Sequence, residues 1–322
     1  MAGKHKSNGV SPVSTSSPID PFLADQGVLL LDGGLATELE NKGYVLDTPL
    51  WSAHLLSTRP EAIREVHRAY LEAGANCIIA ASYQASIQGF LAGGWSEDEA
   101  TSLLRTAVIL AQEARETYLD SRPLPLRPLV AASIGPYGAY LANGAEYRGN
   151  YGVSKQALRE FHEPRWEILT SASPDLLACE TIPSFQEAEV LLDLLSQTPH
   201  QFAWVSFSCH DGEHISDGTP IRDCAALLDD CEQVVAVGVN CTAPRYISSL
   251  IEQLHAAMSN TEVVVYPNSG EVYNAGTKTW QGTSEPLSCG PIAREWHARG
   301  ARLIGGCCRM GPAHIEAIGA AF

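Results

Sequence analysis

Eight short apolar segments alternate with longer segments of helical periodicity along most of this chain. The apolar segments are nearly continuous in hydrophobicity, which is typical of parallel strands that are covered on both faces. We predict strands at residues 28–31, 77–81, 129–132, 176–179, 202–207, 234–239, 262–266 and 302–305.

The segments between these strands place apolar residues on one side of a helix. Within residues 60–73, for example, Val66 and Tyr70 share a face, and Thr58, three residues before Glu61, is predicted to cap the helix. Helices are predicted at residues 60–73, 96–119, 155–170, 185–195, 221–228, 245–258, 291–299 and 312–320. A helix after each of the eight strands predicts a single (β/α)8 TIM barrel.

The competing fold is an open, doubly wound sheet. That fold places a glycine-rich nucleotide-binding turn after its first strand, and no G-x-G-x-x-G follows residues 28–31. We therefore predict one barrel domain over residues 22–322, preceded by a disordered, serine-rich tail at residues 1–21. The tyrosine- and glycine-rich segment 135–152 is predicted to be an active-site loop or lid.

Composition and charge argue against some classes of binding partner. The 322 residues carry a formal net charge of -16, which argues against nucleic acid or an anionic membrane because both are polyanions. No segment contains the ~18 consecutive apolar residues that a spanning helix needs. The nine cysteines are not preceded by a secretory signal, so we expect reduced thiols in a cytoplasmic protein. Small molecules are the expected partners, and a monomer or small homo-oligomer is the expected assembly.

The residues that follow the strands of a TIM barrel meet at one mouth and carry its chemistry. Here they include two carboxylates and three cysteines: Asp32, Glu180, Cys241, Cys307 and Cys308. Three thiolates can bind one tetrahedral zinc ion and leave its fourth position open, as catalytic zinc sites do. Adjacent residues on a regular strand point to opposite faces, so the two neighbouring cysteines can share a metal only if the chain bends. The glycine pair before them permits that bend.

Other interpretations of these residues stay open at this point. The cysteines could be ordinary buried thiols, or the adjacent pair could form a strained disulfide. Asp32 and Glu180 could be the acid and base of a glycosidase. His210 and His214 could bind a metal, although histidines in a charged loop such as HDGEH are more often solvated.

Several motifs resemble those of the homocysteine S-methyltransferase family. GVNC at residues 238–241 and GGCC at 305–308 are similar to the zinc motifs of that family, and DGGLATELE at 32–40 is similar to its first strand and loop. Further matches in the same order, including ASYQASIQGF, LACETIPS and VVYPNSGEVY, resemble the plant and microbial branch that uses S-methylmethionine.

The resemblance implies a TIM barrel in which Cys241, Cys307 and Cys308 hold zinc. The implied reaction transfers a methyl group from S-methylmethionine or S-adenosylmethionine to the thiol of L-homocysteine, giving methionine. Asp32 and Glu180 match the family positions that bind the amino-acid substrate.

Three further residues bear on the substrates. Trp51, in TPLW, and Asn240, in GVNC, are predicted to belong to the substrate site. Gln84 stands where the betaine-using branch has a tyrosine, which argues against betaine as the donor. No organic cofactor is implied beside Zn2+.

Two other functions fit the sequence. One is a zinc methyltransferase for another small thiol or selenol, such as selenocysteine. The other is a barrel that stores zinc or senses oxidants without turnover. The second does not explain why two acids follow strands at the same mouth.

Overall fold

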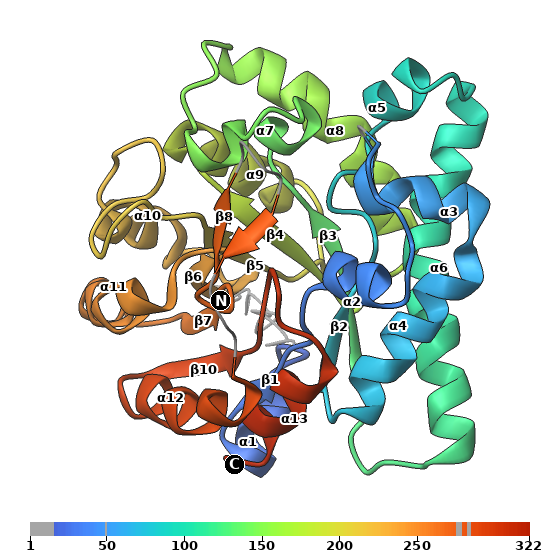
Figure 1. Ribbon diagram of the computed structural model, residues 1–322. Helices are drawn as coiled ribbons and strands as arrows, with labels where there is room; N and C mark the ends of the chain where they lie inside the picture. Colours follow the sequence, from blue (N-terminus) through green and yellow to red (C-terminus); the bar gives the residue numbers. More distant parts are fainter. Residues whose placement is uncertain (1–15, 49, 275–278, 282–284) are drawn as a thin grey trace, which may run out of the picture.

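The computed structural model describes residues 16–48, 50–274, 279–281 and 285–322. Eight parallel strands pair in the order β1-β10-β7-β6-β5-β4-β3-β2, and a parallel bridge between Leu31 and Cys77 joins β1 to β2. Helices surround these strands (Figure 1). The predicted TIM barrel is confirmed. Within the described ranges, no helix has the length and apolar character needed to cross a membrane.

The barrel strands all lie where the hydrophobic pattern predicts them, with differences of a few residues at their ends. They are β1 (Leu29–Leu30), β2 (Cys77–Ile79), β3 (Leu129–Ile134), β4 (Leu176–Ile182), β5 (Ala203–Phe207), β6 (Val234–Asn240), β7 (Glu262–Tyr266) and β10 (Ala301–Ile304). Side chains alternate along them: Leu30 packs against the outer helices, whereas Leu29 and Leu31 fill the barrel interior. Both faces are apolar, which explains the continuous hydrophobic runs.

Each strand is followed by a helix that covers the outside of the barrel. These helices are α4 (Pro60–Glu72), α6 (Glu97–Ser121), α8 (Lys155–Ser171), α9 (Phe185–Ser196), α10 (Ile221–Leu228), α11 (Pro244–Ala257), α12 (Pro286–Ala298) and α13 (Pro312–Gly319). They match the predicted helices, except that α12 begins five residues before the predicted residue 291. Pro286 occupies its first turn, where proline is tolerated, and Pro291 lies inside the helix.

Shorter elements lie in the connections. They are α1 (Asp20–Gln26), α2 (Leu35–Asn41), η1 (Trp51–His54), α3 (Leu55–Thr58), α5 (Ile87–Ala92), α7 (Tyr137–Tyr140), η2 (Ala145–Tyr147) and the hairpin of β8 (Val272–Asn274) and β9 (Thr279–Gln281). The loop predicted at 135–152 therefore contains α7 and η2.

Two predictions need correction: the residue at which ordered structure begins and the residue that caps α4. Ordered structure begins before residue 22, because Ile19 is buried and α1 starts at Asp20. Ile19 and Phe22 pack with the interior side chains of the barrel, so this segment belongs to the core. Residues 1–15 lie outside the described residues. Thr58 does not cap α4, because it belongs to α3 and its hydroxyl donates to the His54 carbonyl.

Candidate metal and substrate site

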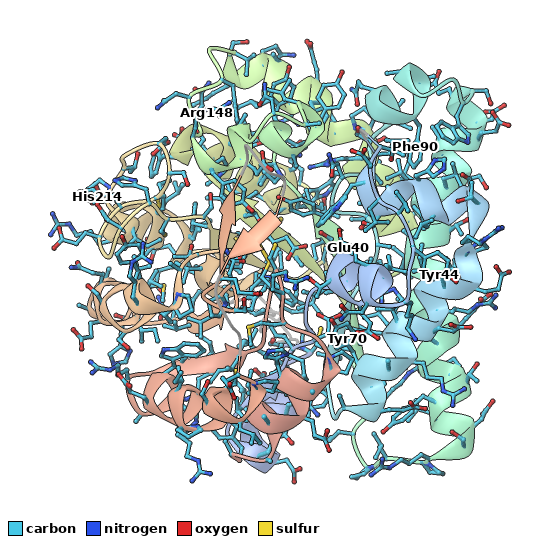
Figure 2. All side chains as sticks on the ribbon, in the orientation of Figure 1. Glu40, Tyr44, Tyr70, Phe90, Arg148 and His214 are labelled. Atoms are coloured by element: carbon cyan, nitrogen blue, oxygen red, sulfur yellow. A yellow bond between two sulfur atoms is a disulfide. The ribbon has the colours of Figure 1, made fainter. Side chains whose placement is uncertain are left out.

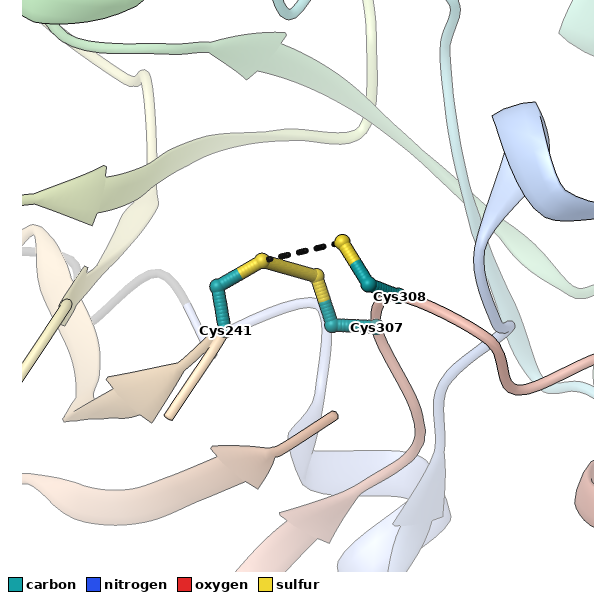
Figure 3. Close-up of side chains that lie close together, drawn as sticks. All are labelled: Cys241, Cys307 and Cys308. Carbon is teal, nitrogen blue, oxygen red and sulfur yellow. Dashed lines mark hydrogen bonds between the residues drawn. A yellow bond between two sulfur atoms is a disulfide. The ribbon is translucent and has the colours of Figure 1, made fainter. Parts of the chain in front are cut away.

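Three cysteines lie together at the mouth of the barrel, from the ends of β6 and β10. The sulfur atoms of Cys241, Cys307 and Cys308 all lie within 4.8 Å of one another. In this structure Cys241 and Cys307 are joined by a disulfide, and the Sγ atoms of Cys241 and Cys308 are 3.6 Å apart (Figure 3). The predicted convergence of the three residues is present. The interpretation of a disulfide between the adjacent pair is wrong, because the partner of Cys307 comes from β6.

The chain bends after β10, which ends at Ile304, so the two adjacent cysteines lie beyond the strand. The bend needs glycine because the backbone packs closely. A Cβ on Gly305 would lie 2.6 Å from the Leu31 Cβ, and one on Gly306 would lie 2.6 Å from the Met310 Cβ.

The loop after β1 forms hydrogen bonds with the segment that carries Cys307 and Cys308. Gly306 donates its N–H to the Asp32 carbonyl at 3.0 Å, and Gly34 donates to the Met310 carbonyl at 2.9 Å. A Cβ on Gly34 would lie 2.6 Å from the Cys307 carbonyl oxygen. The DGG sequence thus allows the first loop to pack against the segment that carries two of the cysteines.

Asp32 is buried at the end of β1 and has one carboxylate oxygen without a partner. Its Oδ2 accepts from the Ile79 N–H at 2.8 Å, whereas its buried Oδ1 has no hydrogen-bond partner in the structure. Burial raises the pKa of Asp32 well above its ordinary value; the Ile79 bond opposes this effect and the charge of Glu180 reinforces it. An unsatisfied buried oxygen is costly, so Oδ1 is an acceptor suited to a ligand donor.

Glu180 lies in a β-bulge at the end of β4, where the register with β5 shifts between Cys179 and Ile182. The Ser133 hydroxyl donates to Glu180 Oε1. Burial raises the pKa of Glu180 to about 7, against the opposing effect of hydrogen bonds from Ser133 and Tyr266. Bulges re-aim side chains next to active sites, and the charge of Glu180 acts on Cys308 at the mouth.

Asn240 is fully buried at the end of β6, next to Cys241. Its Oδ1 accepts from the Thr181 N–H at 2.7 Å and from the Ser206 hydroxyl at 2.9 Å, and its Nδ2 donates to Thr181 Oγ1 at 2.7 Å. These contacts join β6 to β4 and β5. Direct contact between Asn240 and a substrate stays a prediction.

The remaining residues predicted from the sequence make contacts of their own. The Trp51 ring packs edge-on against Tyr83, with ring centroids 6.4 Å apart. Gln84 donates to the Ala139 carbonyl and so holds the loop 135–152. His210 and His214 form a separate cluster with Asp211, and His214 lies at the periphery of the molecule (Figure 2).

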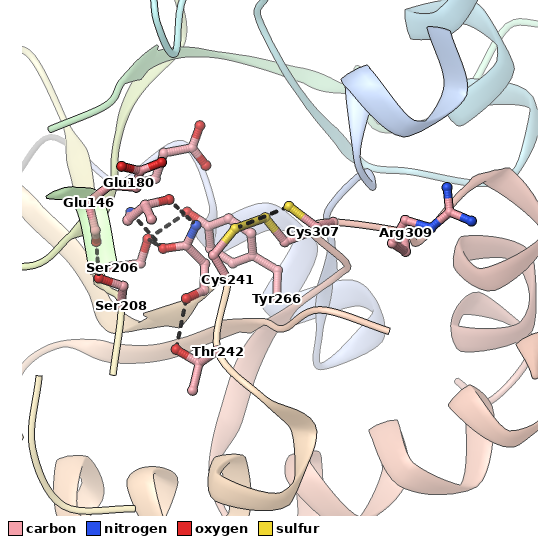
Figure 4. The surroundings of a disulfide bond; sticks show 12 residues. Glu146, Glu180, Ser206, Ser208, Cys241, Thr242, Tyr266, Cys307 and Arg309 are labelled. Carbon is pink, nitrogen blue, oxygen red and sulfur yellow. Dashed lines mark hydrogen bonds between the residues drawn. A yellow bond between two sulfur atoms is a disulfide. The ribbon is translucent and has the colours of Figure 1, made fainter. Parts of the chain in front are cut away.

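Sequence reasoning identified the loop 135–152 but none of its site residues. Glu146, in η2, has a buried Oε2 without a hydrogen-bond partner. Figure 4 shows Glu146 and Glu180 on the same side of the three sulfur atoms. The only available signal was an acid within a loop already expected at the mouth.

The three cysteines fit a bound metal ion. Tetrahedral zinc with Zn–S bonds of about 2.3 Å requires sulfur atoms about 3.8 Å apart, close to the 3.6 Å between Cys241 and Cys308. Burial raises the pKa of the Cys308 thiol to about 12, and the charges of Glu40, Glu146 and Glu180 contribute. A cation would offset this negative field and stabilise the thiolates.

A TIM barrel with three convergent thiols and two buried acids at its mouth defines a metal-thiolate enzyme site. The family model for homocysteine S-methyltransferase matches residues 29–322. This chain belongs to the homocysteine S-methyltransferase family, and it is a methyltransferase that acts on homocysteine.

Individual relatives agree over nearly their whole length. The homocysteine S-methyltransferase YbgG of Bacillus subtilis is 51% identical, with 94% of this chain and 97% of that protein covered. The homocysteine S-methyltransferase of Escherichia coli is 50% identical, with 95% and 99% covered.

Solved structures are equally similar. The oxidized form of the homocysteine methyltransferase MmuM from Escherichia coli has a TM-score of 0.87 at 48% identity, covering 95% of this chain and 100% of that one. Its metallated form has a TM-score of 0.86 at the same identity and coverage.

Proposed function

We propose that this enzyme transfers a methyl group from a sulfonium donor, S-methylmethionine or S-adenosylmethionine, to the thiol of L-homocysteine, with zinc held by Cys241, Cys307 and Cys308. The observation that carries the proposal is the three sulfur atoms within 4.8 Å of one another. Asp32, whose backbone carbonyl accepts from Gly306 just before two of these cysteines, has a buried oxygen without a partner. The cysteine-rich site requires reduced thiols, which fits a cytoplasmic location.

Asp32 and Glu180 supply the site for the substrate ammonium group. The free Oδ1 of Asp32 can accept an N–H bond, and a cation beside both acids favours their ionised forms. The ammonium group is then held at one side of the mouth while the thiol reaches the cysteines. Trp51 and Asn240 complete this proposed site, the first beside Tyr83 and the second through its hold on Thr181.

Cys241, Cys307 and Cys308 would hold the zinc ion, which would supply Lewis-acid chemistry that keeps the homocysteine sulfur ionised near neutral pH. In the transfer itself, a lone pair of the homocysteine sulfur forms the new S–CH3 bond. The old S–CH3 bond breaks, and its electron pair stays on the donor sulfur, which becomes a neutral thioether. The protein's own residues position the two sulfurs and exclude water.

The test is methionine formation from L-homocysteine with S-methylmethionine, S-adenosylmethionine and betaine in parallel, together with zinc content. Cys308→Ala is compared with Cys289→Ala, which changes a cysteine of α12 outside the cluster. We expect turnover with a sulfonium donor and about one zinc per chain in wild type and Cys289→Ala, and loss of both in Cys308→Ala.

Other outcomes would replace the proposal. Zinc binding without turnover on any donor would favour storage or sensing. A higher kcat/KM with selenocysteine than with L-homocysteine would favour a selenol substrate. Glycosidase activity that survives Cys308→Ala would favour the two acids as a hydrolytic pair.

A further inference from the structure

Glu146 combines a buried, unpartnered carboxylate oxygen with a rigidly held backbone. Its Oε2 has no hydrogen-bond partner in the structure, while its carbonyl accepts from the Ser208 hydroxyl at 2.7 Å. A Cβ on Gly138 would lie 2.5 Å from the Glu146 N, so the loop folds back on itself only with glycine at position 138. The backbone is fixed, and one carboxylate oxygen, Oε2, is left for a donor group of a ligand.

A second acid, Glu187 of α9, holds the loop that carries Glu146. Glu187 is fully buried and accepts from the Tyr137 N–H at 2.6 Å and from the Tyr151 hydroxyl at 2.9 Å. Its Oε1 also lies 2.8 Å from His162 Nε2. Because Tyr137 and Tyr151 lie near the two ends of the loop 135–152, one carboxylate fixes both ends.

Glu146 lies near the cysteine cluster, where the proposed methyl transfer would take place. Glu146 lies close enough to Cys308 for their charges to interact, as Glu40 and Glu180 also do. In Figure 4, Glu146 and Glu180 both lie on the side of the cysteines away from Arg309. Asp32 and Glu180 suffice for one ammonium group, which leaves Glu146 without a role in homocysteine binding.

We propose that Glu146 is a specificity-determining residue for the methyl donor: its carboxylate attracts the positive sulfonium group and distinguishes it from a neutral thioether. The inference rests on the proposed function. The donor loses its sulfonium charge when the methyl group leaves, so Glu146 attracts the donor more strongly than its product. The interaction also weakens as the reaction proceeds, so it serves donor binding and product release rather than the chemical step.

The experiment compares zinc-loaded wild type, Glu146→Gln and Glu146→Asp, with Glu160→Gln as the matched control. Glu160 is an exposed glutamate of α8 that bonds to Gln156. Because Glu146 Oε2 has no partner and glutamine has nearly the same size and shape, the amide should preserve the fold, which thermal unfolding checks. Two quantities are measured: steady-state kinetics with S-methylmethionine, and binding of S-methylmethionine and of methionine without homocysteine, by calorimetry.

We expect Glu146→Gln to raise the KM for S-methylmethionine about tenfold, with kcat and the KM for homocysteine changed less than about threefold. Binding of S-methylmethionine should weaken by the same factor while binding of methionine does not change. Glu146→Asp and Glu160→Gln should keep the preference for the sulfonium.

Equal weakening of both ligands, or no change in either, would overturn the inference. These results are separable from failure of the proposed function. If wild type transfers no methyl group from any sulfonium, the proposed function fails. If wild type turns over and Glu146→Gln keeps its preference for the sulfonium, only the role of Glu146 fails.

Discussion

The side-chain amide of Asn240 forms two hydrogen bonds with Thr181, accepting from its N–H and donating to its hydroxyl, each at 2.7 Å. Thr181 has a φ of +59°, in the left-handed region that a β-branched residue rarely adopts. The pair connects β6, which leads into Cys241, to the bulge of β4, which carries Glu180. The proposed metal site and the proposed ammonium site are therefore held by the same pair of hydrogen bonds.

Asn240→Ala should lower the stability of the protein and weaken homocysteine binding. The Thr181 N–H would lose its acceptor inside the barrel, so we expect a loss of about 1–3 kcal/mol in the free energy of unfolding. The KM for homocysteine should rise, because Glu180 is adjacent to Thr181. Thermal unfolding and steady-state kinetics check this, with Asn260→Ala as an exposed asparagine control. A variant with wild-type KM would show that the bulge holds without Asn240.

Asp32→Asn should impair homocysteine binding without removing the metal. The amide oxygen can still accept from Ile79, but the charge facing the substrate ammonium is lost. We expect the KM for homocysteine to rise about 10- to 100-fold, the range of a charged hydrogen bond, with zinc content unchanged.

Asp175→Asn is a useful contrast to that variant. Asp175 accepts from the Val130 N–H at 2.7 Å and pairs with Arg115. Its loss should lower the melting temperature and leave the KM for homocysteine unchanged. An unchanged KM in Asp32→Asn would remove Asp32 from the substrate site.

Glu180 should destabilise the substrate-free protein as pH rises. Its pKa is raised to about 7 from an ordinary 4.5, so between those values the folded state binds more protons than the unfolded state, and the free energy of unfolding falls as pH increases. Above pH 7, ionised Glu180 lowers the free energy of unfolding by on the order of 3 kcal/mol. Glu180→Gln should therefore be more stable than wild type at pH 8 and similar at pH 5.

Glu180→Gln should lose activity although it gains stability, because the neutral amide cannot attract an ammonium group. The kcat/KM of wild type for homocysteine should rise with pH through about 7, and Glu180→Gln should lose that rise. Equal stability of the two proteins at pH 8 would contradict the assigned pKa.

The disulfide between Cys241 and Cys307 and the proposed zinc site use the same sulfur atoms. Oxidised protein should therefore show seven titratable thiols in denaturant and bind no zinc at the mouth, whereas reduced protein should show all nine thiols. Thiol titration with parallel metal analysis checks both forms. Tight zinc binding by the seven-thiol form would count against the three-cysteine site.

The barrel was predictable because its strands are buried on both faces and its helices are amphipathic, so each element carries its own hydrophobic signal. The convergence of Asp32 and Glu180 with the cysteines follows from the same rule, since all of them come directly after strands. The pairing of Cys241 with Cys307 does not follow from sequence, because it depends on how the chain bends beyond Ile304.

Features without periodicity were missed or misplaced. The bulge at Glu180 and Thr181 is stabilised by Asn240, a contact across two strands that no local pattern records. Glu146 belongs to a loop whose conformation depends on Glu187, more than thirty residues later in the sequence. The prediction that Thr58 caps α4 was wrong because Thr58 belongs to the preceding helix, α3, and its hydroxyl donates to the His54 carbonyl.

The most direct test of the central claim is zinc K-edge X-ray absorption on the reduced, zinc-loaded enzyme, before and after addition of L-homocysteine. We predict three sulfur ligands and one lighter ligand without substrate, and a fourth sulfur at about 2.3 Å when homocysteine is present. A zinc environment that does not change with homocysteine, or that Cys308→Ala retains, would contradict the account.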